Sequence, residues 1–167
     1  RDKGLLRWRN QPLVEYLLLA LGSQVTHLAI NANRHLEQYA AYGYPVISDQ
    51  LSDFQGPLAG FASALEGVKT PYIVFLPCDA PRVAADYVQR LWCGCLAENT
   101  ELAVAHDGER LQPVHALVGV SLLPSLLQFL KSGQRKIDVW YAEHRYAVVD
   151  FSDQAFMFDN INTPAQY

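Results

Sequence analysis

The sequence predicts an α/β protein, a three-layer α/β/α sandwich around a Rossmann-like, mostly parallel sheet with a mixed C-terminal portion. In the first half, short apolar stretches alternate with helical periodicity, which predicts right-handed parallel βαβ units. Residues 73–76 are Ile, Val, Phe and Leu in succession, the pattern of a strand buried on both faces. In the second half, strands are separated only by loops in places, which predicts the mixed portion.

The elements of the first half follow from helix-end signals and apolar spacing. Pro12 suits the first turn of a helix, and apolar residues follow it at helical spacing. Asn33 is suited to cap a second helix, and Gly43 ends it. The predicted helices span residues 12–21, 34–42, from the glycine loop at 56–60 to about 66, and 84–96. The predicted strands span residues 26–32, 44–47 and 73–76, and residues 5–8 are predicted to form a short strand or turn.

The second half is predicted to begin with a strand and its hairpin partner or neighbour. Gly133 ends a helix in this half, and Asn162-Thr163-Pro164 has the pattern of a capped helix start. The predicted strands span residues 102–105, 114–120, 145–151 and 156–161, and the predicted helices span residues 122–131 and 136–141.

The composition describes an ordinary globular protein of one domain. The chain has 167 residues, of which 50% are hydrophobic and 18% are charged. Its net charge of −4 argues against a broad nucleic-acid or membrane surface, and no apolar run is long enough for a transmembrane helix. The 3 cysteines are an odd number without metal-site spacing, which favours a reducing cytoplasm.

Asp79 is the strongest candidate for a functional residue. It follows the apolar strand at residues 73–76, between Pro77 and Pro81. Because Pro cannot continue a central strand, Asp79 lies at the carboxyl end of this strand, where open α/β sheets bind ligands. A carboxylate placed there can hold Mg²⁺ or a substrate hydroxyl. The alternative is that Asp79 only caps the helix that follows.

Other predicted strands also end in side chains that can bind a ligand. Asn31 and Asp49 end strands of the first half, and Asn160 and Asn162 follow the last strand. Because Asn and Asp are common turn formers, each of them alone has a plain structural explanation. Several along one rim of a parallel sheet favour a ligand crevice, in which the amides of Asn31 and Asn33 can read a base edge or a ribose.

Phosphate groups are expected near three further positions. Lys3 can neutralise triphosphate charge, and Gly-Pro-Leu-Ala-Gly at residues 56–60 opens a helix whose N-terminus attracts an anion. Arg135 and Lys136 form a basic doublet that can receive a substrate phosphate. Each also has a plain alternative, namely a solvated terminal lysine, a lone glycine pair and a solvated doublet.

A set of motifs in a fixed order extends over essentially the whole chain. They are Asp2-Lys3-Gly4-Leu5-Leu6, Asn31-Ala32-Asn33-Arg34, Ile47-Ser48-Asp49, Gly56-Pro57-Leu58-Ala59-Gly60, Pro77-Cys78-Asp79, His106-Asp107-Gly108-Glu109-Arg110 and Asn160-Ile161-Asn162-Thr163-Pro164. Together they resemble the molybdenum cofactor guanylyltransferases, the MobA-type enzymes of the nucleotidyltransferase superfamily. The resemblance implies a Rossmann-like enzyme that transfers GMP from GTP to the terminal phosphate of molybdenum-bound molybdopterin and releases pyrophosphate.

The resemblance also implies roles for individual residues. They are Lys3 for the GTP phosphates, Asn31 and Asp49 for the nucleotide, Asp79 for Mg²⁺, Gly56 and Pro57 near the active site, Lys136 for the pterin, and Asn160 and Asn162 for activity. Asn162 is also placed like a second metal ligand of the wider superfamily, so the implied catalytic set is Lys3, Asp79 and Asn162. Lys136 stands where the family can have Arg, which keeps the charge but loses bidentate geometry.

The family's opening motif, a strand followed by a glycine-rich loop, is absent from this sequence, which has no initiator Met. We therefore expect residues 1–167 to form a single nucleotidyltransferase domain that lacks its first strand and glycine-rich loop. A chain that truly began at Arg1 would lack half of its nucleotide site and is expected to be inactive.

The resemblance implies GTP and molybdenum-molybdopterin as substrates, Mg²⁺ as cofactor, and a cytoplasmic monomer with transient contacts to molybdopterin-handling and acceptor proteins. No nucleic-acid or membrane partner is expected. One alternative is a cytidylyl- or sugar-nucleotidyltransferase of the same fold. Another is a non-catalytic nucleotide- or molybdopterin-binding carrier, against which Asp79 and Lys3 argue, because a carrier needs no metal carboxylate facing a phosphate-binding lysine.

Overall fold

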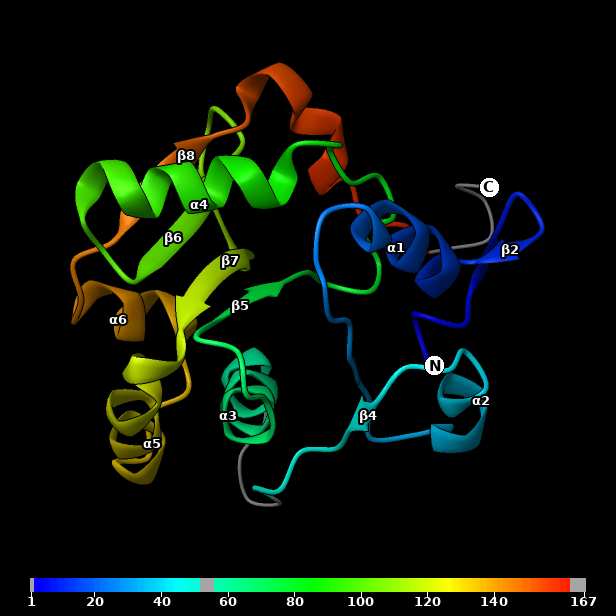
Figure 1. Ribbon diagram of the computed structural model, residues 1–167, viewed down its shortest axis with the longest axis horizontal. Helices are drawn as coiled ribbons and strands as arrows, with labels where there is room; N and C mark the ends of the chain where they lie inside the picture. The colour runs from blue at the N-terminus through cyan, green and yellow to red at the C-terminus, as the bar shows by residue number, and fades with distance from the viewer. Residues whose placement is uncertain (1, 52–55, 163–167) are drawn as a thin grey trace.

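The computed structural model describes residues 2–51 and 56–162, and its main sheet has four strands in the order β5-β7-β6-β8 (Figure 1). The strands are β5 (Tyr72–Phe75), β6 (Leu102–His106), β7 (Leu111–Gly119) and β8 (Ala147–Asp150). β7 runs antiparallel to both β5 and β6, and β8 runs parallel to β6. The predicted mixed portion is therefore confirmed, including the β6–β7 hairpin.

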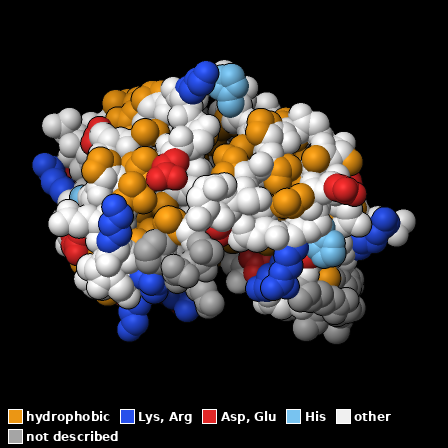
Figure 2. Space-filling model, turned by 90° about the horizontal axis from the view of Figure 1, so that it is seen from below, with side chains coloured by type: hydrophobic (Ala, Val, Ile, Leu, Met, Phe, Trp, Pro, Cys, Tyr) orange, Lys and Arg blue, Asp and Glu red, His pale blue; other side chains and the backbone are white. Residues whose placement is uncertain are grey.

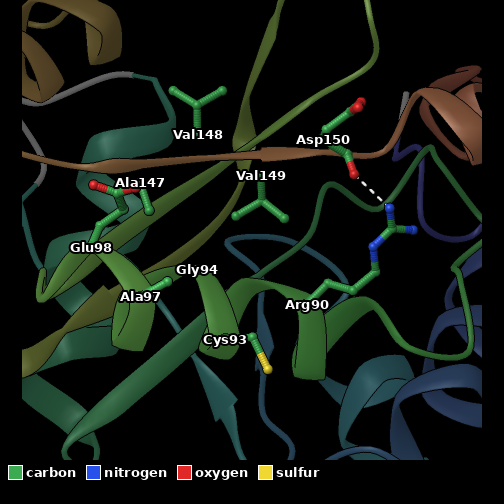
Figure 3. A pocket seen from close by; sticks show the side chains of 9 residues that line it. All are labelled: Arg90, Cys93, Gly94, Ala97, Glu98, Ala147, Val148, Val149 and Asp150. Carbon is green, nitrogen blue, oxygen red and sulfur yellow. Dashed lines mark hydrogen bonds between the residues drawn. The ribbon is translucent and has the colours of Figure 1, made fainter.

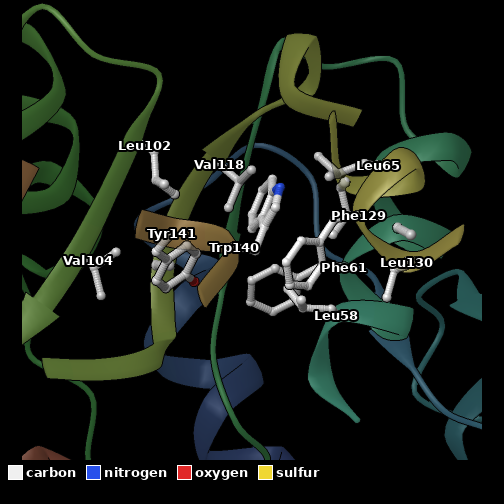
Figure 4. Close-up of a cluster of buried hydrophobic side chains, with 13 residues drawn as sticks. Leu58, Phe61, Leu65, Leu102, Val104, Val118, Phe129, Leu130, Trp140 and Tyr141 are labelled. Atoms are coloured by element: carbon white, nitrogen blue, oxygen red, sulfur yellow. The ribbon is translucent and has the colours of Figure 1, made fainter. Parts of the chain in front are cut away.

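Helices cover both faces of this sheet and form the outer layers of the sandwich (Figure 1). One layer holds α3 (Pro57–Gly67), α5 (Leu123–Lys131) and α6 (Ile137–Ala142), and the other holds α4 (Tyr87–Glu98). The alternation along β6 supplies both cores, because Leu102 and Val104 face the first layer while Ala103 and Ala105 face α4. Figure 4 shows the first of these cores, in which Trp140 packs among leucine and phenylalanine side chains.

α4 packs closely on the edge strand β8. A Cβ atom on Gly94 would lie 2.6 Å from Cγ2 of Val149, so only glycine permits this approach. Figure 3 shows Val149 pointing toward α4 and Val148 pointing away from it. Arg90 donates a hydrogen bond to the backbone oxygen of Asp150 at 2.5 Å and closes one end of the groove between the two elements.

The N-terminal region is built from shorter elements. They are β1 (Arg7–Trp8), β2 (Gln11–Pro12), α1 (Leu13–Gly22), β3 (Ile30–Asn31), α2 (Leu36–Ala40) and β4 (Val46–Ile47). β3 and β4 pair in parallel across α2, which confirms the predicted βαβ unit. Within the described ranges, no ladder joins this pair to the main sheet, although α3 contacts both β4 and β5.

Two predicted strands, the one at residues 26–32 and the one that became β5, differ from the structure. The strand expected at residues 26–32 is reduced to Ile30 and Asn31, because only these residues find a partner, on β4. β5 was predicted to be buried on both faces, yet all four of its residues are half-buried. β7 covers one edge of β5, and no other strand of the described residues covers the second edge.

The strand predicted at residues 156–161 is wrong. The chain instead forms a 3₁₀ segment, η2 (Ser152–Phe158), interrupted by a non-helical residue at Gln154. Met157 and Phe158 join the core under α4, so the apolar run reflects packing against the sheet rather than a strand. The helix start predicted at 162–164 lies mostly outside the described residues. Within the part of the chain that the structure describes, no helix is long and apolar enough to cross a membrane.

Candidate active site

Asp79 and Lys3 form an ion pair at the carboxyl end of β5. Lys3 Nζ donates to Asp79 Oδ2 at 2.7 Å, although the two residues are 76 positions apart in the chain. The Asp79 side chain is 10% exposed and that of Lys3 is 50% exposed. The carboxylate is therefore fixed in the wall of the site while the ammonium group reaches solvent. The structure thus brings together the two residues on which the sequence interpretation depended most.

The turn at the N-terminus places Lys3. The carboxylate of Asp2 accepts hydrogen bonds from the backbone N–H of Gly4 and from the hydroxyl of Tyr39 on α2. Burial, and then this hydrogen bond to Asp2, raise the pKa of the Tyr39 hydroxyl. A Cβ atom on Gly4 would lie 2.5 Å from that hydroxyl, so glycine is required for the turn to approach α2. The Asp2-Lys3-Gly4 motif is therefore anchored on both sides of the lysine.

Asn31, Asn33 and Asp49 form a second polar group at the ends of β3 and β4. The amides of Asn31 and Asn33 donate to the two carboxylate oxygens of Asp49, each at 2.9 Å. The side-chain oxygen of Asn33 accepts the backbone N–H of Asp49 at 2.8 Å. The prediction that Asn33 caps the following helix is wrong, because the N-cap of α2 is His35 and no side chain caps it.

The start of α3 lies against this second group. A Cβ atom on Gly60 would lie 2.7 Å from Oδ1 of Asn31 and 3.7 Å from Oδ1 of Asp49. Gly56 precedes the helix with a φ of 98°, and Pro57 occupies its first turn. Both are exposed. The first turn of α3 therefore faces the Asn31–Asp49 pair, and its role in binding an anion stays a prediction.

The segment that carries Asn160 and Asn162 is attached directly to Asp79. Between the two asparagines, the backbone N–H of Ile161 donates to the backbone oxygen of Asp79 at 2.8 Å. Asn160 and Asn162 are both exposed. Lys136 is not brought to this site, since it precedes α6, which lies with α5 toward the other end of the long axis from the N-terminal segment (Figure 1).

His115 is a candidate that the sequence interpretation missed. It lies on β7, is 3% exposed, and its Nε2 atom has no hydrogen-bond partner among the described residues. Burial lowers its pKa to about 4, although the charge of Asp79 acts in the opposite direction. Its ring lies 4.8 Å from that of Phe158, just before the Asn160 segment. The sequence did contain a signal for it, because His115 is the one polar residue in the apolar run from 114 to 118.

The donor set at Asp79 suits a cation that is completed by substrate. Mg²⁺ commonly takes one or two carboxylates and fills its remaining positions with phosphate oxygens and water. Asp79 supplies one nearly buried carboxylate, which already binds the cationic ammonium of Lys3. Among the described residues, no group of three or more His, Cys, Asp or Glu side chains forms a metal cage. A metal site whose remaining ligands are substrate phosphate oxygens and water does not need such a cage.

Basic and acidic side chains are mixed on the face shown in Figure 2, and they do not form one large patch of a single sign. The groove between α4 and β8 contains none of the predicted site residues. The candidate site is therefore defined by the side chains at the carboxyl ends of β3, β4 and β5.

The family model of the MobA-like NTP transferase domain matches residues 1–147 of this chain. The chain belongs to this family. Over 165 residues it is 46% identical to the molybdenum cofactor guanylyltransferase of Shewanella loihica, covering 99% of this chain and 84% of that protein. The enzyme of the same name from Shewanella halifaxensis is also 46% identical, with 82% of its length covered. The resemblance inferred from the motifs is confirmed.

Solved structures agree with the fold of this MobA-like domain. The molybdopterin-guanine dinucleotide biosynthesis protein A of Archaeoglobus fulgidus has a TM-score of 0.80 at 21% identity, over 98% of this chain and 86% of that chain. The 2-C-methyl-D-erythritol 4-phosphate cytidylyltransferase of Thermus thermophilus has a TM-score of 0.72 at 16% identity, over 98% and 89%. At these identities the likeness concerns the fold alone, and it confirms the predicted α/β class.

Proposed function

We propose that this chain transfers GMP from GTP to the terminal phosphate of molybdenum-bound molybdopterin and releases pyrophosphate, in the biosynthesis of molybdopterin guanine dinucleotide. The family membership and the 46% identity to molybdenum cofactor guanylyltransferases support the proposal. The observation that carries it is the 2.7 Å pair of Lys3 and Asp79 at the carboxyl end of β5. A carboxylate and a half-exposed ammonium at one point match the opposite charges of a metal–nucleotide complex.

The residues of the site contribute mainly position and charge, which is what transfer at a phosphorus atom requires. Lys3 would neutralise the leaving pyrophosphate, and its exposure leaves it free to move from Asp79 to the phosphates. Asn31 and Asp49 would bind the nucleoside. The in-line attack comes from an oxygen of the pterin phosphate, so no protein nucleophile is needed.

Mg²⁺ would be held by Asp79, with Asn162 as a second ligand. When bound, the ion supplies Lewis-acid stabilisation of the charge on the nucleotide phosphates. Asp79 is suited to this role because two independent contacts fix it, the ammonium of Lys3 on its side chain and the N–H of Ile161 on its backbone. Asn160, Gly56 and Pro57 would form the surroundings of the pterin.

We also propose that the protein acts as a cytoplasmic monomer that contacts molybdopterin-handling and acceptor proteins transiently. Residues 1–167 would form one nucleotidyltransferase domain whose sheet accepts a further strand beside β5. The half-buried state of all four β5 residues supports this proposal, since a strand with apolar side chains on both faces is normally covered on both edges.

Nucleotide choice is tested by thermal unfolding of the full-length chain with GTP, CTP, ATP and UTP, each with Mg²⁺. A ligand present at about 100 times its dissociation constant stabilises the fold by roughly 2.7 kcal/mol, which raises Tm by roughly 5–10 °C for a domain of this size. GTP alone is expected to give this shift. A preference for CTP would instead support the cytidylyltransferase alternative, and no response to any nucleotide would contradict the proposal.

Turnover is tested with Asp79→Ala, measured as Mg²⁺-dependent release of pyrophosphate. We expect loss of at least about a hundredfold in kcat with Tm nearly unchanged, because a preorganised charge at the reacting group is lost. The matched control is Asp153→Asn, which breaks an exposed ion pair with Arg90 away from the site. Near-normal turnover of Asp79→Ala would remove Asp79 from the metal role.

A further inference from the structure

A partly exposed cluster beside the candidate site has no role in the proposed chemistry. It consists of Trp8, Arg9, Arg82 and Asp159, and it is called the Trp8 cluster below. The guanidinium carbon of Arg9 lies 4.7 Å from the centroid of the indole ring, and that of Arg82 lies 5.5 Å from it. Two cations thus share one aromatic ring, an arrangement in which each ring contact is favourable but the two charges repel.

Arg9 has a left-handed backbone conformation that arginine rarely adopts. It and Asn10 form the two-residue loop of the β1–β2 hairpin, since Trp8 pairs with Gln11. Their φ angles are 47° and 67°, the left-handed pair that such tight hairpins require. Glycine and asparagine are preferred there, so arginine at the first position costs stability that the turn alone does not require. The turn itself therefore does not account for an arginine at position 9, and its side chain is expected to have a role of its own.

The charges of the Trp8 cluster are not balanced. Arg82 lies 3.4 Å from the carboxylate of Asp159, and their side chains are 39% and 67% exposed, so this ion pair is weak and open to exchange. Within residues 2–51 and 56–162, no carboxylate lies within ion-pair distance of Arg9. The cluster thus holds two guanidinium groups and one carboxylate, which pairs with Arg82 alone, and this excess of positive charge favours an added anion.

The Trp8 cluster is joined to the candidate site by direct contacts. Trp8 packs against the buried group of Leu6, Leu13 and Ile161. Ile161 in turn donates its backbone N–H to Asp79 at 2.8 Å. The cluster therefore borders the segment that carries Asn160 and Asn162.

We propose that Arg9 and Arg82 of the Trp8 cluster bind a phosphate monoester, the terminal phosphate of the acceptor substrate, in exchange for Asp159. The identity of the acceptor rests on the proposed function, but the binding of a phosphate monoester does not. Two guanidinium groups around one anion give charge-assisted, bidentate hydrogen bonds, which a lysine cannot supply. The Trp8 cluster is adjacent to the Asp79 segment, whereas Lys136 is not. The proposal therefore gives the contact with the acceptor phosphate to Arg9 and Arg82 rather than to Lys136.

Binding is tested with inorganic phosphate as the probe, by following the indole N–H signal of Trp8 in ¹H–¹⁵N NMR spectra. The signal is assigned by its loss in Trp8→Phe. We expect a saturable shift of the Trp8 signal, and at least about tenfold weaker binding in the double variant Arg9→Gln, Arg82→Gln. Asp159→Asn should bind phosphate several-fold more tightly, because it removes the competing anion. Arg145→Gln, at an exposed arginine that pairs with Glu98 at the end of α4, should behave like the parent chain.

A second measurement separates this proposal from the proposed function. In turnover assays, the double variant should raise the KM for the acceptor about tenfold and leave the KM for GTP unchanged. If turnover occurs but phosphate leaves the Trp8 signal unmoved, or moves it equally in the double variant, the cluster does not bind phosphate. If phosphate binds but no acceptor turns over, the proposed function fails and the phosphate site stands. A raised KM for GTP alone would assign the cluster to the nucleotide and overturn the proposal.

Discussion

The main sheet and the N-terminal region are stabilised in different ways. In the sheet, residues 102–105 of β6 are at most 1% exposed and lie between two layers of helices. In the N-terminal region, β3 and β4 pair over only two residues each, and side-chain hydrogen bonds such as those of Asp49 hold the chain together. The sheet is stabilised by burial, and the N-terminal region depends much more on polar contacts.

The candidate site lies where these two regions meet. Lys3, Asn31 and Asp49 come from the N-terminal region, while Asp79 and the Asn160 segment belong to the sheet. The ion pair between Lys3 and Asp79 crosses the boundary directly. Bound nucleotide would add contacts to both sides, so we expect substrate to order the N-terminal half of the site more than the sheet half.

The largest expected difference between the regions concerns their cores. Leu102→Ala, at a residue 1% exposed on β6, should lower the free energy of unfolding by roughly 2–5 kcal/mol, because it leaves a cavity between the sheet and the helices. The same substitution at Leu36, which is 44% exposed on α2, should cost less than about 1 kcal/mol. Urea unfolding of both variants measures this, and equal losses would contradict the comparison.

A second expected difference is the sensitivity of the sheet to acid. His115 is neutral in the folded sheet because burial lowers its pKa to about 4, from 6.5. The unfolded chain therefore binds more protons between these values. The stability linked to His115 is fully present above pH 6.5 and is lost as the pH falls to about 4, by roughly 3 kcal/mol at most.

The measurement is urea unfolding of the chain and of His115→Phe between pH 7 and pH 4.5. The variant keeps a ring against Phe158 and should lose much of the pH dependence. Asp107 does not interfere in this window. Hydrogen bonds from the N–H groups of Arg110 and Glu109 lower its pKa to about 2 from 3.8, so its linked stability is lost only at lower pH. Identical slopes for the two chains would rule out His115 as the acid-sensitive group.

The sequence predicted the sheet half well because its signals are strong there. The apolar runs of β6 and β7 are long enough to indicate strands without knowledge of their partners, and the helix α3 was recognised from its glycine-proline start. The strand wrongly predicted after residue 155 shows the limit. Met157 and Phe158 are apolar because they cover the sheet beside α4, and an apolar run alone does not distinguish a strand from a short 3₁₀ segment.

The site was predicted in part. The rim carboxylate Asp79 followed from the proline that ends its strand, but its pairing with Lys3 joins residues 76 positions apart, which no local pattern reveals. The binding of Asn33 to Asp49 was also invisible, since Asn before a helix is equally typical of a cap. Long-range polar contacts thus show which of these residues lie together, which local patterns left open.

The smallest expected effect concerns the hydrogen bond between Asn31 and Asp49 in the N-terminal half of the site. In Gly60→Ala the new Cβ would lie 2.7 Å from Oδ1 of Asn31, so Asn31 must shift and its hydrogen bond to Asp49 weakens. We expect a loss of roughly 1 kcal/mol in nucleotide binding, about a fivefold rise in the dissociation constant of GTP, with Tm changed by less than a few degrees. Calorimetric titration with GTP and Mg²⁺ measures the affinity.

Gly22→Ala is the matched control, because a Cβ there meets no atom within 4 Å at the end of α1. It should leave GTP affinity unchanged and raise stability slightly, as alanine restricts the unfolded chain more than glycine does. If Gly60→Ala and Gly22→Ala bind GTP with equal affinity, the Asn31–Asp49 hydrogen bond only holds the ends of β3 and β4 together. The nucleoside contacts must then come from other residues of the rim.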